Sequence, residues 1–233
     1  MLLKISNVSK RFGGVQALKD VNLQVDRGEF VGLIGPNGSG KTTLINVVTG
    51  LYKPDTGKIL FEGLDITSFP SYRLCKLGIA RTFQIPQPFN NMTVLENVLV
   101  ASEFCSSGDL AYVMEILEEI GLKDKADVLA EKLSLVEKRL LELARALAMK
   151  PKLLFVDEIL AGLRESEINR VTRILSELNE NGITIVWVEH RVHELIKFVR
   201  RLVVLHQGLV IADGEPHEVI NNKLVVEAYL GKV

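Results

Sequence analysis

The sequence has little of what marks a nucleic-acid-binding or a membrane-spanning protein. Lysine and arginine number 28 against 29 for aspartate and glutamate, so the net charge of −1 gives no sign of a nucleic-acid partner. No apolar run approaches the ~20 residues that a membrane-spanning helix needs, and the longest, at residues 183–188 and 202–205, have the length of strands. The 233 residues can bury one hydrophobic core, which fits a single globular domain.

Cysteine is also scarce, and a secretory pattern is missing from the first residues. Cys75 and Cys105 are the two cysteines, and their spacing is not that of metal ligands. We expect them to be packing residues in a reducing compartment. Residues 1–6 lack the extended apolar region and the small-residue cleavage site of a signal peptide. The sequence therefore predicts a cytosolic protein.

Short apolar segments alternate with helical spacing along the chain. Alternation at residues 3–8 and 18–25 predicts strands, and the apolar run at 30–34 predicts a buried strand. Further strands are expected at 58–62, 153–156, 183–188 and 202–205, the last forming a hairpin with 209–212. Residues 93–150 have helical spacing instead, with a turn or short loop at 105–108. This order predicts an α/β core with parallel strands and a helical insertion.

A complete phosphate-binding motif follows the strand at residues 30–34. The segment 35–42, GPNGSGKT, fits G-x-x-x-x-G-K-[ST] and precedes an apolar helix surface. Glycine lets the backbone approach an anion, which the free N–H groups and the helix N-terminus then bind. Lys41 adds a positive charge for the outer phosphates, and Thr42 offers a hydroxyl to Mg²⁺. A glycine-rich turn with a chance lysine is the alternative, and the flanking strand and helix argue against it. The expected phosphate-binding residues are Gly35, Pro36, Asn37, Gly38, Ser39, Gly40, Lys41, Thr42 and Thr43.

Two acidic residues end the apolar run at 153–156. Asp157 is expected to hold Mg²⁺ through its water shell, and Glu158 to orient or deprotonate the attacking water. By itself, an apolar strand that ends in two acids is common and needs no function. Beside a complete phosphate loop, the pair favours a site for hydrolysis of ATP.

These two motifs, in this order and with a helical insert between them, resemble the ABC ATPase family over nearly the whole chain. The resemblance implies a P-loop NTPase core at residues 1–86 and 151–233, an N-terminal antiparallel β subdomain, and an inserted α-helical subdomain at 87–150. It also implies ATP and Mg²⁺ as ligands. Phe12 would stack on adenine, Gln84 would contact Mg²⁺ near the permease, and His190 would bind the γ-phosphate. Without the resemblance, each of these three residues would more often be structural.

The catalytic and metal-binding sets follow from the motifs and the resemblance together. The expected catalytic residues are Lys41, Glu158 and His190, and the expected metal ligands are Thr42, Gln84 and Asp157.

The chain departs from the family pattern at its signature segment. The usual Leu-Ser-Gly-Gly-Gln is LSLVE at residues 133–137, so Leu135 and Val136 replace both glycines. In the family, the serine at the position of Ser134 reaches the γ-phosphate bound by the opposite subunit, an approach that these side chains obstruct. Ser134 and Glu137 also have the spacing of a capping box, which is a sufficient structural reason for the pair. A second departure is Arg164, which stands where the family has an aspartate at the dimer seam.

Several short segments are similar to the ATPases of branched-chain amino-acid importers: 12–14, 17–18, 81–84, 93–98, 161–163 and 226–231. The resemblance implies a subunit on the cytoplasmic face of the membrane that powers solute import through a separate permease. Its partners would be that permease, a second ATPase subunit (a copy of itself or a related chain) and, indirectly, a solute-binding protein.

Three alternatives stay open. A lipopolysaccharide-export ATPase shares much of the core pattern. A non-transport ABC ATPase acting on DNA or ribosomes usually has coiled-coil arms, zinc elements or duplicated cassettes, and the sequence has none of these. The altered signature is compatible with a regulatory module that has lost catalysis, although Lys41, Asp157, Glu158 and His190 are intact.

Overall fold

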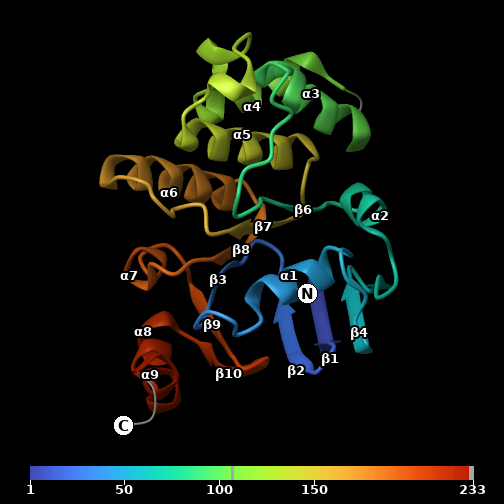
Figure 1. Ribbon diagram of the computed structural model, residues 1–233, viewed down its shortest axis with the longest axis vertical. Helices are drawn as coiled ribbons and strands as arrows, with labels where there is room; N and C mark the ends of the chain where they lie inside the picture. Colours follow the sequence, from blue (N-terminus) through green and yellow to red (C-terminus); the bar gives the residue numbers. More distant parts are fainter. Residues whose placement is uncertain (106–107, 231–233) are drawn as a thin grey trace.

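The structure is a computed structural model that describes residues 1–105 and 108–230. Within these residues the strands form two sheets (Figure 1). One is antiparallel, with strand order β2-β1-β4-β5. Its strands are β1 (Leu3–Phe12), β2 (Val15–Val25), β4 (Thr56–Phe61) and β5 (Leu64–Asp65).

The other sheet, with order β10-β9-β3-β8-β7-β6, is parallel except for its last hairpin. The hairpin of β9 and β10 confirms the pairing predicted from the sequence. The strands of this sheet are β3 (Phe30–Ile34), β6 (Ile79–Arg81), β7 (Leu153–Asp157), β8 (Thr184–Val188), β9 (Arg201–His206) and β10 (Leu209–Gly214).

The parallel sheet is buried on both faces, which explains why its strands are continuous apolar runs. All residues of β3, β7 and β8 are buried. Because side chains alternate across a strand, Val31 and Leu33 join the core beneath α1 (Lys41–Val48) and the antiparallel strands. Phe30 and Ile34 join a second core with α6 (Glu165–Glu180) and the helices of the middle segment. The α/β class expected from the sequence is confirmed.

The middle segment is helical, as its spacing predicts. It contains α3 (Val94–Cys105), α4 (Leu110–Ile120) and α5 (Leu135–Ala148), with short 3₁₀ turns at Lys123–Lys125 and Ala130–Lys132. In Figure 1 these helices lie together at one end of the molecule, and the antiparallel strands lie toward the other end. The division of the chain at residues 87 and 150 remains a prediction. The remaining helices are α2 (Ser71–Lys76), α7 (Val192–Leu195), α8 (Pro216–Ile220) and α9 (Lys223–Leu230).

The capping box predicted for α5 is confirmed. The side chain of Ser134 accepts a hydrogen bond from the backbone N–H of Glu137, at 3.4 Å, and the Glu137 carboxylate accepts one from the backbone N–H of Ser134, at 2.9 Å. The helix therefore begins as its sequence specifies, although both glycines of the usual signature are replaced. Among the described residues, no helix is long and apolar enough to cross a membrane.

The expectation that the two cysteines are separate packing residues is wrong. Cys75 in α2 and Cys105 at the end of α3 form a disulfide, with their Cα atoms 6.7 Å apart and a sequence separation of 30. After α2 the chain forms the edge strand β6 and then enters α3. The spacing of the two cysteines in the sequence does not indicate that α2 and the end of α3 lie close together. Cys105 is also helical, whereas a turn or loop is expected at 105–108; residues 106–107 lie outside the described residues.

Reduction of this disulfide is expected to lower the free energy of unfolding by roughly 3–4 kcal/mol, because a cross-link across a loop of about 30 residues limits the unfolded chain. Urea unfolding with and without a reductant measures the effect. The matched control is the double variant Cys75→Ser/Cys105→Ser, whose stability should not respond to reductant. A wild-type protein equally insensitive to reductant, with two titratable thiols, would contradict the pairing.

Candidate functional site

The loop between β3 and α1 has a backbone that specific glycines allow. A Cβ on Gly35 would lie 2.0 Å from the carbonyl oxygen of Leu205, and one on Gly40 would lie 2.5 Å from that of Ala17. Gly40 also has φ of 110°, a left-handed value that favours glycine. The loop is tied to the β9–β10 hairpin, where the N–H of Gly208 donates to the carbonyl of Ser39 at 2.9 Å. The phosphate motif therefore forms a fixed turn at the start of α1.

Lys41 lies inside this loop. Its side chain is largely buried, and its Nζ donates to the carbonyl oxygens of Gly35, at 2.7 Å, and Pro36, at 3.1 Å. Burial lowers the pKa of Lys41, and the nearby carboxylates of Glu158 and Asp157 oppose that shift. The loop thus presents a partly desolvated ammonium group beside backbone amides, which is a suitable arrangement for binding phosphate.

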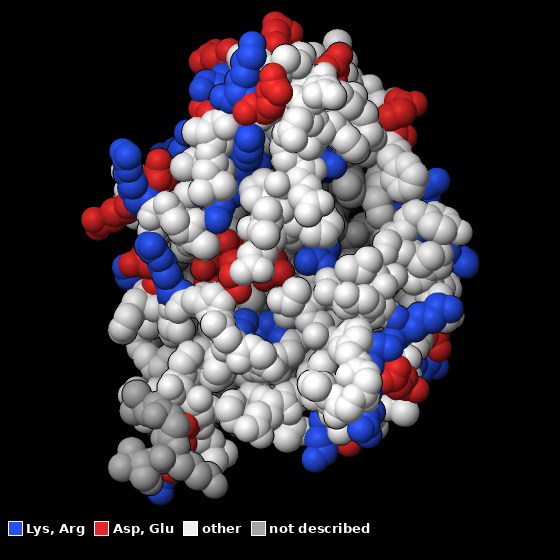
Figure 2. Space-filling model, viewed as in Figure 1, with Lys and Arg blue, Asp and Glu red and all other residues white. Residues whose placement is uncertain are grey.

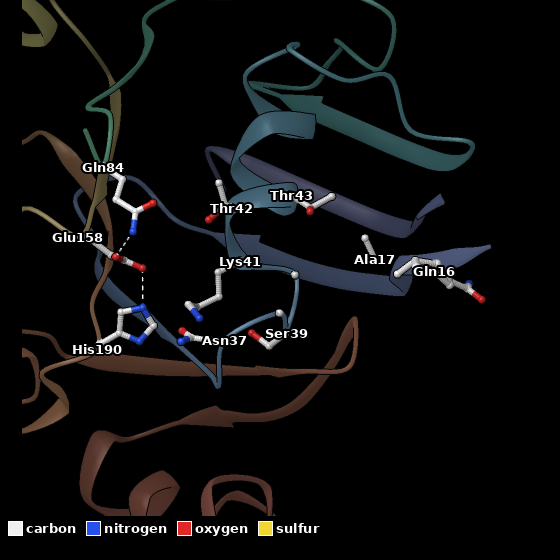
Figure 3. Close-up of a pocket in the computed structure, with 13 residues that line it drawn as sticks. Gln16, Ala17, Asn37, Ser39, Lys41, Thr42, Thr43, Gln84, Glu158 and His190 are labelled. Carbon is white, nitrogen blue, oxygen red and sulfur yellow. Dashed lines mark hydrogen bonds and ion pairs between the residues drawn. The ribbon is translucent and has the colours of Figure 1, made fainter. Parts of the chain in front are cut away.

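A cavity of about 730 Å³ opens in front of the loop. Figure 3 shows Gln84, Glu158 and His190 along one side of it and the phosphate loop with Lys41 beside them. The lining residues are Val15, Gln16, Ala17, Asn37, Gly38, Ser39, Gly40, Lys41, Thr42, Thr43, Gln84, Glu158 and His190. Most of them are expected from the sequence. Val15, Gln16 and Ala17 are not expected from the sequence to line the cavity, although Ala17 belongs to an importer-like segment; they line it because β2 lies at its edge.

Glu158 is the acidic residue among those that line the cavity. Figure 2 shows acidic and basic side chains close together near the middle of one face of the molecule. His190 Nε2 lies 2.5 Å from its Oε1, and the side-chain amide of Gln84 donates to its Oε2. The three residues follow three different strands, β7, β8 and β6, whose carboxyl ends meet here. Glu158 also has φ of 50°, which is uncommon for a residue other than glycine and often occurs at functional sites. Its carboxylate is held by two neighbours and faces the phosphate loop (Figure 3).

Asp157 lies behind Glu158 and is almost completely buried. Neither oxygen of its carboxylate accepts a hydrogen bond from any residue that the structure describes, and Nη2 of Arg81 lies 3.5 Å from Oδ2. Burial raises the pKa of Asp157, and the charge of Arg81 partly offsets this. Buried carboxylate oxygens normally have partners, so these oxygens fit a hydrated cation beside them. Arg81 and Thr82, whose hydroxyl accepts from the Asp157 N–H at 3.1 Å, are functional neighbours that the sequence indicated only as part of the segment 81–84.

Three expected residues lie elsewhere. Phe12 is exposed at the end of β1, packs edge-on against Tyr52 with ring centres 5.1 Å apart, and does not line the cavity. Ser134 caps α5 and does not line it either. Arg164 caps α6, its N–H donating to Glu167 at 2.7 Å. The roles expected for Phe12 at adenine and for Ser134 at the γ-phosphate of an opposite subunit remain predictions, and so does the reversed charge of Arg164 at a dimer seam.

Glu189 is a buried carboxyl that the sequence did not single out. It follows β8 directly before His190, and its Oε1 accepts the backbone N–H of Leu160 at 2.8 Å. Burial raises the pKa of Glu189 to about 7, although the bond from Leu160 favours the charged form. The carboxyl therefore anchors the turn that follows Glu158.

The raised pKa of Glu189 makes stability depend on pH. The folded protein keeps the proton up to about pH 7 and the unfolded chain loses it near 4.5, so ionisation of this group destabilises the fold as the pH rises between these values. The contribution is roughly 3 kcal/mol, lost by about pH 8. Glu189→Gln keeps an acceptor for Leu160 but does not titrate.

Urea unfolding of both proteins from about pH 5 to 8 measures this difference. The wild type should lose more stability than Glu189→Gln over that range. Parallel pH profiles would show that Glu189 does not titrate there.

Comparisons with known proteins agree with this geometry. The chain matches the family described as ABC transporter over residues 18–161 and that described as branched-chain amino acid ATP-binding cassette transporter over residues 210–233. It is 41% identical to the probable branched-chain amino acid transport ATP-binding protein LivG of Archaeoglobus fulgidus, over 99% of this chain and 95% of that protein. It is 36% identical to the high-affinity branched-chain amino acid transport ATP-binding protein LivG of Escherichia coli, over 99% and 98%.

Solved structures give the same result. The ADP conformation of MJ1267, an ATP-binding cassette of an ABC transporter, superimposes with a TM-score of 0.90 at 37% identity, covering 99% of both chains. The dimeric structure of MJ0796, a bacterial ABC transporter cassette, superimposes with a TM-score of 0.85 at 29% identity, covering 92% of this chain and 99% of that one.

Proposed function

The chain belongs to the ABC transporter family as an ATP-binding, ATP-hydrolysing subunit, and we propose that its transporter imports branched-chain amino acids. The observation that carries the catalytic part is the Glu158 carboxylate, held by Gln84 and His190 in the same cavity as the phosphate loop. The match at residues 210–233 and the names of the relatives support the choice of solute.

The phosphate loop is the binding half of the proposed site. Its backbone N–H groups and the start of α1 would bind the phosphates of ATP, and Lys41 would neutralise charge on the outer ones. Lys41 already sits in the loop, paired with two carbonyl oxygens, so its ammonium group needs only a local rearrangement to reach an anion. Ser39, whose buried hydroxyl has no hydrogen-bond partner in the described part of the chain, offers a further donor.

Glu158 would accept the proton of the attacking water. Both of its carboxylate oxygens are oriented by neighbours, and Glu158 and His190 lie on the same side of the cavity, facing Lys41 (Figure 3). Thr42, Gln84 and Asp157 would hold Mg²⁺, and the Asp157 oxygens, which accept no hydrogen bond from the described residues, fit its water shell. When bound, Mg²⁺ supplies positive charge to the phosphate oxygens. Among the described residues no group of three or more acidic, histidine or cysteine side chains could by itself hold a metal ion.

The proposed partners are a membrane permease on the cytoplasmic face of the membrane and a second ATPase subunit, either a copy of this chain or a related one. The dimeric structure of MJ0796 supports the second ATPase subunit as a partner. A groove of about 870 Å³ between α2, α3 and α5 supports the permease as a partner, because exposed aromatic and aliphatic side chains line the groove. A solute-binding protein would act indirectly, on the other side of the permease. The residues of the groove are Lys76, Phe89, Leu99, Val100, Ala101, Glu103, Phe104, Arg145 and Met149.

Deletion of the gene in the organism that encodes it tests the transport assignment. Uptake of labelled leucine, isoleucine and valine should fall, and uptake of histidine should not. The wild-type gene should restore it, whereas a Glu158→Gln gene should not. Unchanged uptake of all three amino acids, with phosphate release intact in the purified protein, would refute the solute and favour an export or regulatory ATPase.

A further inference from the structure

The signature helix α5 contacts the catalytic turn through one buried arginine. Arg139 lies in the first half of α5 and its side chain is largely buried. Its Nη1 donates to the backbone carbonyl oxygen of Glu158, at 3.2 Å, and to that of Ile159. The arginine therefore binds the main chain of the proposed general base itself, from a helix that is distant in sequence.

Several hydrogen bonds constrain the backbone of the turn at residues 158–160, which Arg139 contacts. The N–H of Glu158 donates to the carbonyl of Val188 at 2.9 Å, and the N–H of Leu160 donates to the carboxylate of Glu189 at 2.8 Å. Glu158 itself has φ of 50°, an unfavourable backbone conformation that persists only where the surroundings enforce it. Arg139 donates to the carbonyl groups of Glu158 and Ile159, and the Glu158 carbonyl also accepts a longer bond, at 3.4 Å, from the N–H of Ala161.

Burial of the Arg139 guanidinium costs free energy of folding, which is hard to explain if the side chain serves the fold alone. Among the described residues Arg139 forms no ion pair, and its Nε has no hydrogen-bond partner. Burial lowers its pKa, and the charges of Glu189 and Glu158 oppose that shift. A buried charge bonded only to carbonyl groups is often no more stabilising than an apolar side chain of similar size. Its bonds to the main chain of Glu158 and Ile159 point to a use in catalysis instead.

We propose that Arg139 is a positioning residue for ATP hydrolysis, which fixes the Glu158–Ile159 segment so that the Glu158 carboxylate meets Gln84 and His190. The inference rests on the proposed function of Glu158. It also gives α5 a direct mechanical link to the catalytic turn. Figure 1 places α5 at the boundary between the helices α3 and α4 and the sheet that carries β7. A shift of α5 would therefore move the backbone of Glu158, even though the signature segment before it lacks both glycines.

The test compares Arg139→Met with Arg139→Lys. Methionine keeps the apolar stem and removes both donors, so kcat for phosphate release should fall by about 10- to 100-fold, as expected for a misplaced catalytic group. The KM for ATP should stay within about twofold, because Arg139 does not contact the phosphate loop. Lysine keeps one charged donor group but not the planar fork, and should recover part of kcat. The matched control is Lys138→Met, which removes the adjacent cation of the same helix and should behave as wild type.

A second readout does not depend on hydrolysis. The amide protons of Glu158 and Leu160 should exchange with solvent faster in Arg139→Met than in Lys138→Met, whereas those of α1 should not change. Faster exchange with a reduced kcat supports the proposal. Unchanged kcat and unchanged exchange overturn it, and so does equal loss of ATP binding and thermal stability in both Arg139 variants, which would indicate a purely structural role. A wild-type protein without phosphate release, alone or with its permease, refutes the proposed function; the exchange result then still decides whether Arg139 holds the turn.

Discussion

Replacing Glu158 by glutamine is expected to lower kcat for ATP hydrolysis by about 10²- to 10⁴-fold while ATP still binds. Glutamine has nearly the same shape as glutamate and can keep a hydrogen bond with a neighbour, but it cannot accept the proton of the attacking water. The phosphate loop and Lys41 are untouched, so binding should persist. Phosphate release at saturating Mg-ATP, beside an equilibrium binding titration, measures both quantities.

Glu115→Gln is a suitable control for this variant, because Glu115 is an exposed residue of α4. The Glu158 variant should also accumulate as an ATP-bound dimer, visible by gel filtration, if two subunits close around the nucleotide. Turnover equal to the wild type would exclude Glu158 as the general base. No turnover in either protein, with tight ATP binding, would mean that catalysis requires a partner subunit or has been lost, and addition of the permease complex would separate these two cases.

Replacing Lys41 by methionine is expected to have the other large effect, a loss of about 10²- to 10³-fold in kcat/KM. Methionine fills much of the space of the lysine stem but carries no charge and donates no hydrogen bond. The carbonyl groups of Gly35 and Pro36 lose their donor, and the phosphates lose a cation that burial has already partly desolvated. Titration with ATP measures the change in affinity.

Thermal unfolding with and without Mg-ATP provides an independent check on Lys41→Met. Saturating ligand at about 100 times its Kd stabilises a protein by about 3 kcal/mol, so the wild type should shift to a higher melting temperature. The variant should shift much less. An exposed lysine of α9, Lys223, gives the matched control Lys223→Met. An equal shift in Lys41→Met would show that the ammonium group does not contribute to nucleotide binding.

The family resemblance, and not the residue pattern, predicted two residues of the site that are distant in sequence from Glu158. Gln84 and His190 are unremarkable in the sequence by themselves, a glutamine and a histidine after strand-like segments. The structure brings both to the carboxylate of Glu158, because β6, β7 and β8 are parallel neighbours whose ends meet at one edge of the sheet. The expected roles of Phe12 and Ser134 depend on nucleotide and on a second subunit, and they stay predictions.

The sequence by itself determined the features that depend on neighbouring residues. The phosphate loop is contiguous, so its glycines, Lys41 and Thr42 specify the local backbone and its chemistry together. The buried strands are apolar runs, and the start of α5 is fixed by the capping box of Ser134. Only the tertiary structure decided the pairing of Cys75 with Cys105, the burial of Glu189 and the contact of Arg139 with Glu158. These contacts join residues that are 19 to 30 positions apart in sequence. They form because helices and strands pack on a shared core, and residue spacing along the chain carries no record of that packing.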